Sequence, residues 1–213
     1  MSDTKTEILA GLRSALADHP AAPEVPREYR RSSEISAADT LDMLEDRLID
    51  YKANVYRETT GSIAGRIAEL LGESTRVVLP PELDGQWLPE GEQYQWIVDT
   101  RGSEEGETLT AEELNNADAV VTSSTVSCAE TGTIFLSGQK DEGRRAITLV
   151  PDHHICVVRT DTVVELIPES LERLDPVAPI TMISGPSATS DIELVRVEGV
   201  HGPRTLDVIF LQS

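Results

Sequence analysis

The start of the chain carries apolar residues at helical spacing. In residues 3–18, four apolar side chains recur about one turn apart on one face: Ile8, Leu9, Leu12 and Leu16. This pattern predicts an amphipathic helix. Residues 19–27 contain three prolines and no periodicity, which is typical of an extended linker. We therefore expect residues 1–30 to form a helical arm, which packs on the main domain at 31–213 or on a neighbouring subunit.

Two further helices are predicted before the first strand. Residues 36–58 begin with a capping-box-like start at Ser36 and carry a stripe of apolar side chains three and four apart: Leu41, Leu44, Leu48, Tyr51 and Val55. Residues 62–71 keep the same spacing, and Gly72 is a typical stop signal.

From residue 76 onward, short apolar runs alternate with turns and short helices. We predict strands at residues 76–80, 94–99, 117–122, 131–137, 146–150, 154–159, 180–184, 193–198 and 206–211, and short helices at 110–116 and 168–174. Apolar runs such as 119–121 and 180–184 are typical of a buried, largely parallel sheet. The expected fold class is α/β, a layered sheet with flanking helices and an N-terminal helical arm.

The composition of the chain excludes some classes of binding partner. The chain has 38 acidic and 18 basic residues, giving a net charge of −20. Nucleic acids and anionic membranes both require a basic surface, so neither partner is expected. No apolar run approaches the ~20 residues that span a bilayer, and no signal peptide is visible, so we expect a cytoplasmic protein. An anionic substrate would need a locally positive pocket built from backbone donors and a few arginines.

The two cysteines, Cys128 and Cys156, are not arranged in a CxxC pair, so zinc-ribbon and iron–sulfur motifs are absent. Both lie in apolar, strand-like contexts, which favours buried free thiols. We therefore expect the chain to hold no cofactor of its own, and any cluster to belong to a partner protein.

Residues 180–203 carry the densest group of candidate residues. A short apolar strand leads into a glycine–proline turn, and a predicted helix start follows. The candidate site residues in this segment are Gly185, Ser187, Thr189 and Asp191. Backbone N–H groups left free at such a point bind a phosphate or carboxylate. His201 follows between two glycine-containing dipeptides and adds a titratable imidazole, so Asp191 and His201 are candidate catalytic residues. The alternative is a pair of Gly/Pro-rich turns with a capping serine.

Residues 122–132 form a loop of small hydroxyl residues between strands. Small residues let the backbone approach a ligand closely, which makes Thr131, Gly132 and Thr133 candidate binding residues. Glu130 lies at the loop apex, where a carboxylate could be a general base or a nucleophile. The alternative is that Glu130 accepts hydrogen bonds from its own loop.

Two histidines stand at the start of a predicted strand. Because side chains alternate along a strand, His154 shares a face with Cys156, whereas His153 shares the other face with Ile155. His154 is a candidate catalytic residue. The histidine spacing, with His201 included, matches no metal motif, so we predict no metal site. GxGxxG, P-loop and GxSxG motifs are absent.

Together these segments resemble the LUD-domain family. Residues 129–133, 151–155, 184–193 and 199–203 match its motifs in order, and the chain is similar to the small, cluster-free lactate-utilisation members over residues 35–211. The resemblance implies a fold like the ribose-phosphate isomerase and coenzyme-A transferase superfamily. It also implies a role, with iron–sulfur partner proteins, in oxidising L-lactate to pyruvate. Residues 126–128 depart from the usual lead-in of the family.

Three functions remain open from the sequence. The chain could be an accessory or catalytic subunit of an L-lactate-oxidising complex, for which a small carboxylate is the expected ligand. It could instead be a stand-alone enzyme for a small anionic carbonyl or acyl metabolite, including one linked to coenzyme A. Glu130 would then act like the glutamate nucleophile of transferases with a similar fold, an argument from fold alone. The third function is ligand sensing or scaffolding. The arm is compatible with an arm-exchanged homodimer.

Overall fold

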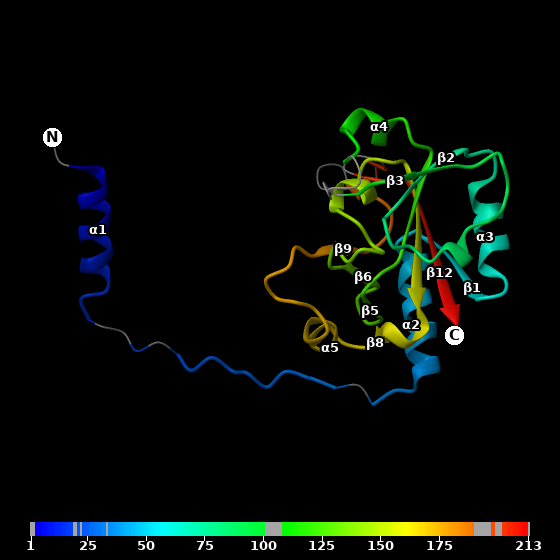
Figure 1. Ribbon diagram of the computed structural model, residues 1–213. Coiled ribbons are helices and arrows are strands. Elements are labelled where there is room, and N and C mark those ends of the chain that lie inside the picture. The colour runs from blue at the N-terminus through cyan, green and yellow to red at the C-terminus, as the bar shows by residue number, and fades with distance from the viewer. Residues whose placement is uncertain are drawn as a thin grey trace.

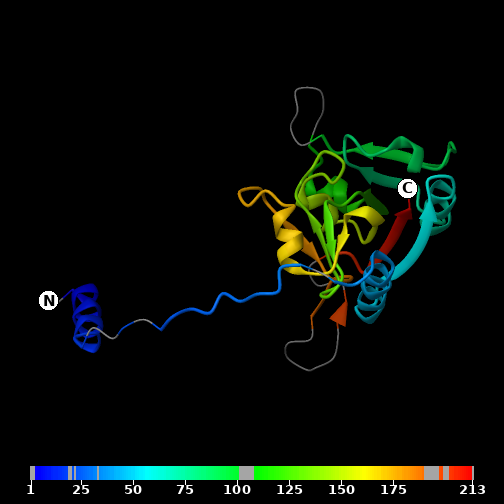
Figure 2. The same ribbon diagram turned by 90° about the horizontal axis from the view of Figure 1, so that it is seen from below.

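The computed structural model describes residues 3–18, 21, 23–32, 34–100, 108–189, 197–198 and 202–212. The predicted N-terminal helix is confirmed as α1 (Thr4–Ala15), which begins after Asp3, whose side chain accepts a hydrogen bond from the Lys5 N–H. α1 stands apart from the rest of the chain in both views (Figures 1 and 2). None of its residues is buried, so its apolar stripe has no cover within the described part of the chain.

The main sheet has six parallel strands in the order β1-β12-β7-β4-β2-β3. Its strands are β1 (Asn54–Thr59), β2 (Arg76–Leu79), β3 (Gln95–Val98), β4 (Ala119–Thr122), β7 (His153–Arg159) and β12 (Thr205–Gln212). The central strands are buried along most of their length, as the apolar runs of the sequence predict. The register places His154 beside Val120 on one side and Leu206 on the other.

A second, smaller sheet packs beside the first in the order β8-β5-β6-β9. Its strands are β8 (Val163–Val164), β5 (Val126–Cys128), β6 (Thr133–Leu136) and β9 (Thr181–Ile183), and a separate two-stranded ribbon pairs β10 (Ala188–Thr189) with β11 (Val197–Glu198). β5, β6 and β9 are antiparallel neighbours, so the fold is a parallel sheet joined to a mostly antiparallel one.

The helices cover these sheets in layers. They are α2 (Ala37–Asp50), α3 (Ile63–Leu71), α4 (Ala111–Asn115) and α5 (Ile167–Glu172), with 3₁₀ turns η1 (Gly85–Trp87), η2 (Arg145–Thr148) and η3 (Thr160–Thr162). α3 packs its buried side chains on one face of the main sheet, whereas Leu44 and Leu48 of α2 pack with β6 on the other face. α5 covers the outer face of the small sheet. The predicted α/β class with a layered sheet and flanking helices is confirmed.

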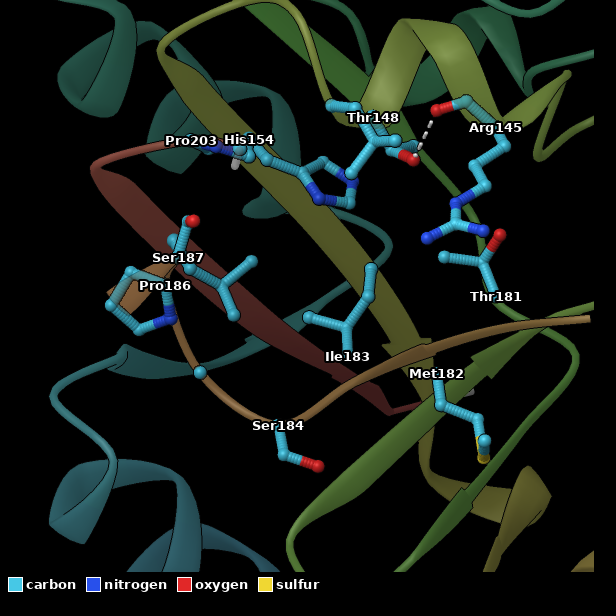
Figure 3. A pocket seen from close by; sticks show the side chains of 14 residues that line it. Arg145, Thr148, His154, Thr181, Met182, Ile183, Ser184, Pro186, Ser187 and Pro203 are labelled. Carbon is cyan, nitrogen blue, oxygen red and sulfur yellow. Dashed lines mark hydrogen bonds between the residues drawn. The ribbon is translucent and has the colours of Figure 1, made fainter. Parts of the chain in front are cut away.

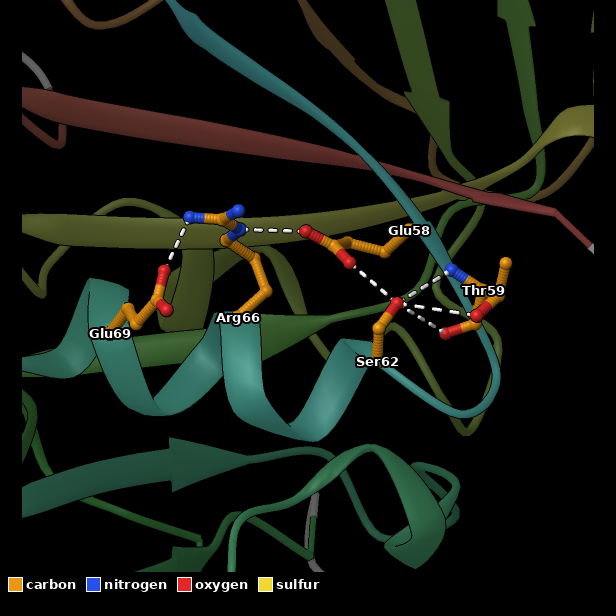
Figure 4. A network of polar contacts seen from close by, with 5 residues as sticks. All are labelled: Glu58, Thr59, Ser62, Arg66 and Glu69. Atoms are coloured by element: carbon orange, nitrogen blue, oxygen red, sulfur yellow. Dashed lines mark hydrogen bonds and ion pairs between the residues drawn. The ribbon is translucent and has the colours of Figure 1, made fainter.

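The turn from β1 into α3 is held by a polar network (Figure 4). The Ser62 hydroxyl donates to Glu58 at 2.5 Å and accepts from the Thr59 N–H at 3.0 Å, while Arg66 Nε lies 2.7 Å from Glu58. The Ser62 hydroxyl, helped by Arg66, lowers the pKa of Glu58 below its usual value. This network ties the start of α3 to the end of β1, which is an edge strand of the main sheet.

Some predicted elements are wrong. The helix expected at 36–58 ends at Asp50, and β1 begins at Asn54. Lys52 has φ of 72°, a left-handed conformation that ends the helix, and the following residues pair with β12. Tertiary pairing therefore overrides the helical spacing of Val55. The strand expected at 146–150 does not form, because residues 145–148 are the 3₁₀ turn η2, and β5 was not predicted.

The segment at 180–189 also differs from its prediction. β9 forms, but it is an edge strand of the small sheet, with Met182 67 % exposed, and is not buried. After the turn at Gly185 the chain enters β10, where a helix start was expected. The predicted anion cradle at a helix N-terminus is thus absent from the described residues of this segment. The Asp191 that was expected to complete the helical turn lies outside them.

Candidate functional site

A cavity of about 230 Å³ lies at the amino ends of β7 and β12 (Figure 3). His154 and Leu206, each the second residue of its strand, line it together with η2, with residues 181–187, and with Gly202 and Pro203. Ligands of parallel α/β sheets usually bind at the carboxyl ends of the strands. The position of this cavity is therefore set by β9 and the turn after it, and not by the topology of the main sheet alone.

Gly185 explains how the turn after β9 can close the cavity. Its φ is 98°, and a Cβ at this position would lie 2.6 Å from Tyr51 Cβ at the end of α2. Only glycine fits both requirements. Beyond the turn, the Ser187 N–H donates to the Pro203 carbonyl at 2.9 Å, which joins the segment after β9 to the segment before β12. The glycine–proline motifs at 185–187 and 202–203 thus meet in space.

His154 is buried at the inner wall of the cavity. Its side chain faces the same side of β7 as Cys156, as the alternation predicts, and its Nε2 lies 2.8 Å from Thr122 Oγ1. Burial lowers the pKa of His154 to about 3, with a smaller contribution from the neighbouring His153. The imidazole is therefore neutral at neutral pH, and it is suited to hydrogen bonding rather than to carrying charge.

Arg145 is a cation at the wall of this cavity, as a locally positive pocket requires, although the sequence did not indicate which arginine it would be. Its neighbour Arg144 is committed to the fold, since its Nε lies 2.7 Å from Asp99 Oδ2 and its guanidinium also donates to Asp99 Oδ1 and the Leu109 carbonyl. In contrast, no carboxylate among the described residues pairs with the guanidinium of Arg145, which lines the cavity. The sequence does carry one signal for a cation here, the pair of adjacent arginines. Two adjacent side chains point in different directions, so only one of the two arginines can face the core.

Glu130 lies in the turn between β5 and β6, outside the lining of this cavity. Its side chain is 44 % exposed and forms an ion pair with Arg30 of the N-terminal linker. Arg30 also lies 3.6 Å from Glu165, whose carbonyl accepts the Glu130 N–H. Glu130 therefore binds neither its own loop nor the cavity, and its catalytic role stays a prediction.

The residues after Glu130 connect that turn to the cavity. Thr133 Oγ1 lies 2.8 Å from Thr131 Oγ1 and 2.9 Å from Ser184 Oγ, and Ser184 lines the cavity. Gly132 has φ of 61°, and a Cβ there would lie 2.7 Å from Arg47 Cβ of α2. The absence of a side chain at Gly132 accommodates α2, and its role in ligand binding stays a prediction.

The remaining candidates are only partly described. Thr189 lies in β10, and its side chain is outside the described part, as are Asp191 and His201. Their proposed roles stay predictions. Gly185 and Ser187 do line the cavity with His154, so the structure brings three of the sequence candidates together.

One polar cluster joins residues that are far apart in the sequence and was not predicted. His153 Nε2 lies 2.5 Å from Asp207 Oδ2, and Asn54 Nδ2 donates to Asp207 Oδ1 at 2.8 Å. The cluster is on the α3 side of the main sheet, so it does not contribute to the cavity. Within the described ranges, no group of three or more metal-ligating side chains suits a metal ion, and no helix could cross a membrane.

Comparison with known proteins identifies relatives of this chain. The family model for the LUD domain matches residues 42–211. The chain is 42% identical over 212 residues to lactate utilization protein C of Deinococcus radiodurans, covering 98% of this chain and 95% of that protein. It is 32% identical over 129 residues to lactate utilization protein C of Bacillus licheniformis, covering 57% of this chain and 51% of that protein.

A solved structure supports the same relationship. The chain superposes on the crystal structure of a DUF162 family protein from Deinococcus radiodurans with a TM-score of 0.69 and 36% sequence identity. The match covers 83% of this chain and 99% of that chain.

Proposed function

The chain belongs to the LUD-domain family, and we propose on that basis that it is a component of an L-lactate utilisation system. Its proposed role is in the oxidation of L-lactate to pyruvate, together with iron–sulfur partner proteins in the cytoplasm. The near full-length similarity to a protein named for lactate utilisation supports this role.

Arg145 is the observation that supports a ligand in the cavity. The chain has a net charge of −20, which repels anions at long range. A guanidinium at the wall of a cavity, paired with no carboxylate among the described residues, offers a carboxylate ligand a strong local partner in a bidentate geometry. We infer that Arg145 binds the carboxylate of lactate or pyruvate, with His154 and Ser187 at the polar wall.

The chemistry divides between this chain and its partners. Conversion of L-lactate to pyruvate removes a pair of electrons and two protons, from the C2 carbon and its hydroxyl. The chain has only two cysteines, and both are buried; burial raises the pKa of Cys156 to about 12. An iron–sulfur cluster needs a larger set of cysteine ligands. The proposed electron acceptors are therefore clusters of the partner proteins, while this chain binds and orients the acid.

Growth on L-lactate tests the proposal. Deleting the gene is expected to abolish growth on L-lactate as the carbon source but not on glucose, and wild-type chain supplied from a plasmid should restore growth. Arg145→Gln should fail to restore it. Arg173→Gln removes the same charge from an exposed side chain outside the cavity and should restore growth fully. Normal growth of the deletion strain on L-lactate would contradict the proposal.

A thermal-shift assay separates this function from the acyl-group alternative. A ligand that binds only the folded state stabilises it, by ~2.7 kcal/mol at a hundredfold excess over its Kd. L-lactate or pyruvate should raise the unfolding temperature of the wild-type protein. A shift with coenzyme A alone would instead favour an enzyme that acts on acyl groups.

A further inference from the structure

A second cavity adjoins the one that contains His154. It has a volume of about 260 Å³ and shares three lining residues with the first: Arg145, Thr148 and Thr181. In Figure 3, Arg145 and Thr181 stand at the opposite end of the first cavity from Pro186 and Ser187. The guanidinium of Arg145, which has no carboxylate partner in the described part of the chain, therefore lies at the junction of two compartments.

Away from the three shared residues, the lining of the second compartment is mostly apolar. Leu136, Pro179 and Ile180 line it, together with two glycines and Arg144. The guanidinium of Arg144 is held by Asp99 and the Leu109 carbonyl, so it is already satisfied. The polar side chains left for a ligand are those of the residues at the junction. Among them, the Thr148 hydroxyl donates its hydrogen to the Arg145 carbonyl. Such a compartment suits a hydrocarbon chain whose charged end is at Arg145.

The volumes of the two compartments also favour a ligand larger than lactate. Pockets for ligands of ordinary metabolite or drug size occupy about 300–1,000 Å³. Each compartment is smaller than this range, and the two together fall within it. Lactate has only a methyl side chain, so it would leave the second compartment without an occupant.

We propose that the site accepts 2-hydroxy or 2-oxo carboxylates with side chains of about four carbons, and binds them more tightly than lactate. The carboxylate binds Arg145, the C2 oxygen faces the compartment of His154, and the side chain enters the second compartment between Pro179 and Leu136. This inference rests on the proposed function, because it needs Arg145 to bind a carboxylate.

Calorimetric titration of the full chain with a homologous series tests it. The ligands are L-lactate, L-2-hydroxybutyrate and L-2-hydroxyhexanoate. Burying one methylene changes the dissociation constant about fourfold, so the hexanoate should bind on the order of fiftyfold more tightly than lactate. Equal or weaker binding of the hexanoate would overturn the inference.

A pair of loop variants locates the side chain. Pro179→Trp fills the second compartment and should remove the gain for the hexanoate, while the Kd of lactate stays within about twofold. Pro176→Trp places the same bulk in the same exposed loop, away from either compartment, and should behave as the wild type. If Pro179→Trp leaves the gain intact, the side chain does not occupy this compartment, and the inference fails.

The outcomes separate this inference from the proposed function. If lactate binds and requires Arg145 but the hexanoate binds no more tightly, only the inference fails. If the hexanoate binds and lactate does not, the inference stands and lactate is not the ligand of this site. If neither acid binds, both the inference and the placement of the ligand at Arg145 are wrong.

Discussion

The cavity at His154 and the turn at Glu130 carry similar residue types but differ in surroundings. The cavity is concave, its histidine is buried and neutral, and its cation Arg145 has no counter-charge among the described residues. The turn is exposed, and its carboxylate already has a partner in Arg30. Residue type alone marked both regions as candidates. Concavity and an unsatisfied charge favour the first as the ligand site.

The two regions share one structural support. Gly185 beside the cavity and Gly132 in the turn both approach the last turn of α2, and Thr133 and Ser184 are joined by a hydrogen bond. The end of α2 therefore holds both segments in place. This packing is a structural reason for glycine at both positions.

The largest predicted effect is a difference in the free energy of unfolding between variants of the two neighbouring arginines. Arg144→Gln leaves the Asp99 carboxylate buried without its cation, which should lower the free energy of unfolding by about 3 kcal/mol. Arg145→Gln removes an exposed charge that forms no ion pair with the described residues, and its effect on the free energy of unfolding should be within about 0.5 kcal/mol. Urea denaturation measures both. Equal losses would show that Arg145 also serves the fold.

The next effect concerns the buried histidine of the cavity. The folded state holds the pKa of His154 at about 3, against an ordinary value of 6.5. Below pH 6.5 the unfolded chain therefore binds a proton that the folded chain does not, and stability falls as pH falls, by up to about 1.4 kcal/mol per unit. Between pH 7 and pH 5 this loss is about 2 kcal/mol.

His154→Asn should lack this part of the pH dependence, since asparagine does not titrate. The measurement is urea denaturation of both proteins at pH 7 and pH 5. The same loss in wild type and variant would mean that His154 is not the group responsible.

The smallest effects on stability are expected from substitutions at the turn that contains Glu130. Glu130→Gln and Arg30→Gln each break an ion pair between exposed side chains, which is worth less than about 0.5 kcal/mol and is screened by salt. The free energy of unfolding should therefore change little at physiological salt, and still less at high salt. A loss above about 1 kcal/mol would show that the linker supports the main domain through this contact.

The sequence predicted most elements whose pattern is decided locally. α1 and α3 follow from apolar spacing and the glycine stop at Gly72, and the central strands follow from continuous apolar runs. The facing of His154 and His153 follows from strand alternation. β1 was missed because Val55 continues the stripe of α2, and only pairing with β12 makes this segment a strand.

The site was predictable in part. The motifs containing His154, Gly185 and Ser187 were recognised, and the structure gathers them at one cavity. Arg145 was not named, because sequence alone does not show which of two adjacent arginines is paired with Asp99. Asp207 was missed for a similar reason, since its partners His153 and Asn54 are distant along the chain.

The most direct test of the ligand site is calorimetric titration of pyruvate into two variants, Arg145→Gln and Glu130→Gln. A hydrogen bond to a charged group contributes about 1.5–3 kcal/mol, so Arg145→Gln should weaken binding by at least about tenfold. Glu130→Gln should bind as tightly as the wild type. Weakened binding in Glu130→Gln with unchanged binding in Arg145→Gln would place the ligand at the turn and contradict this account.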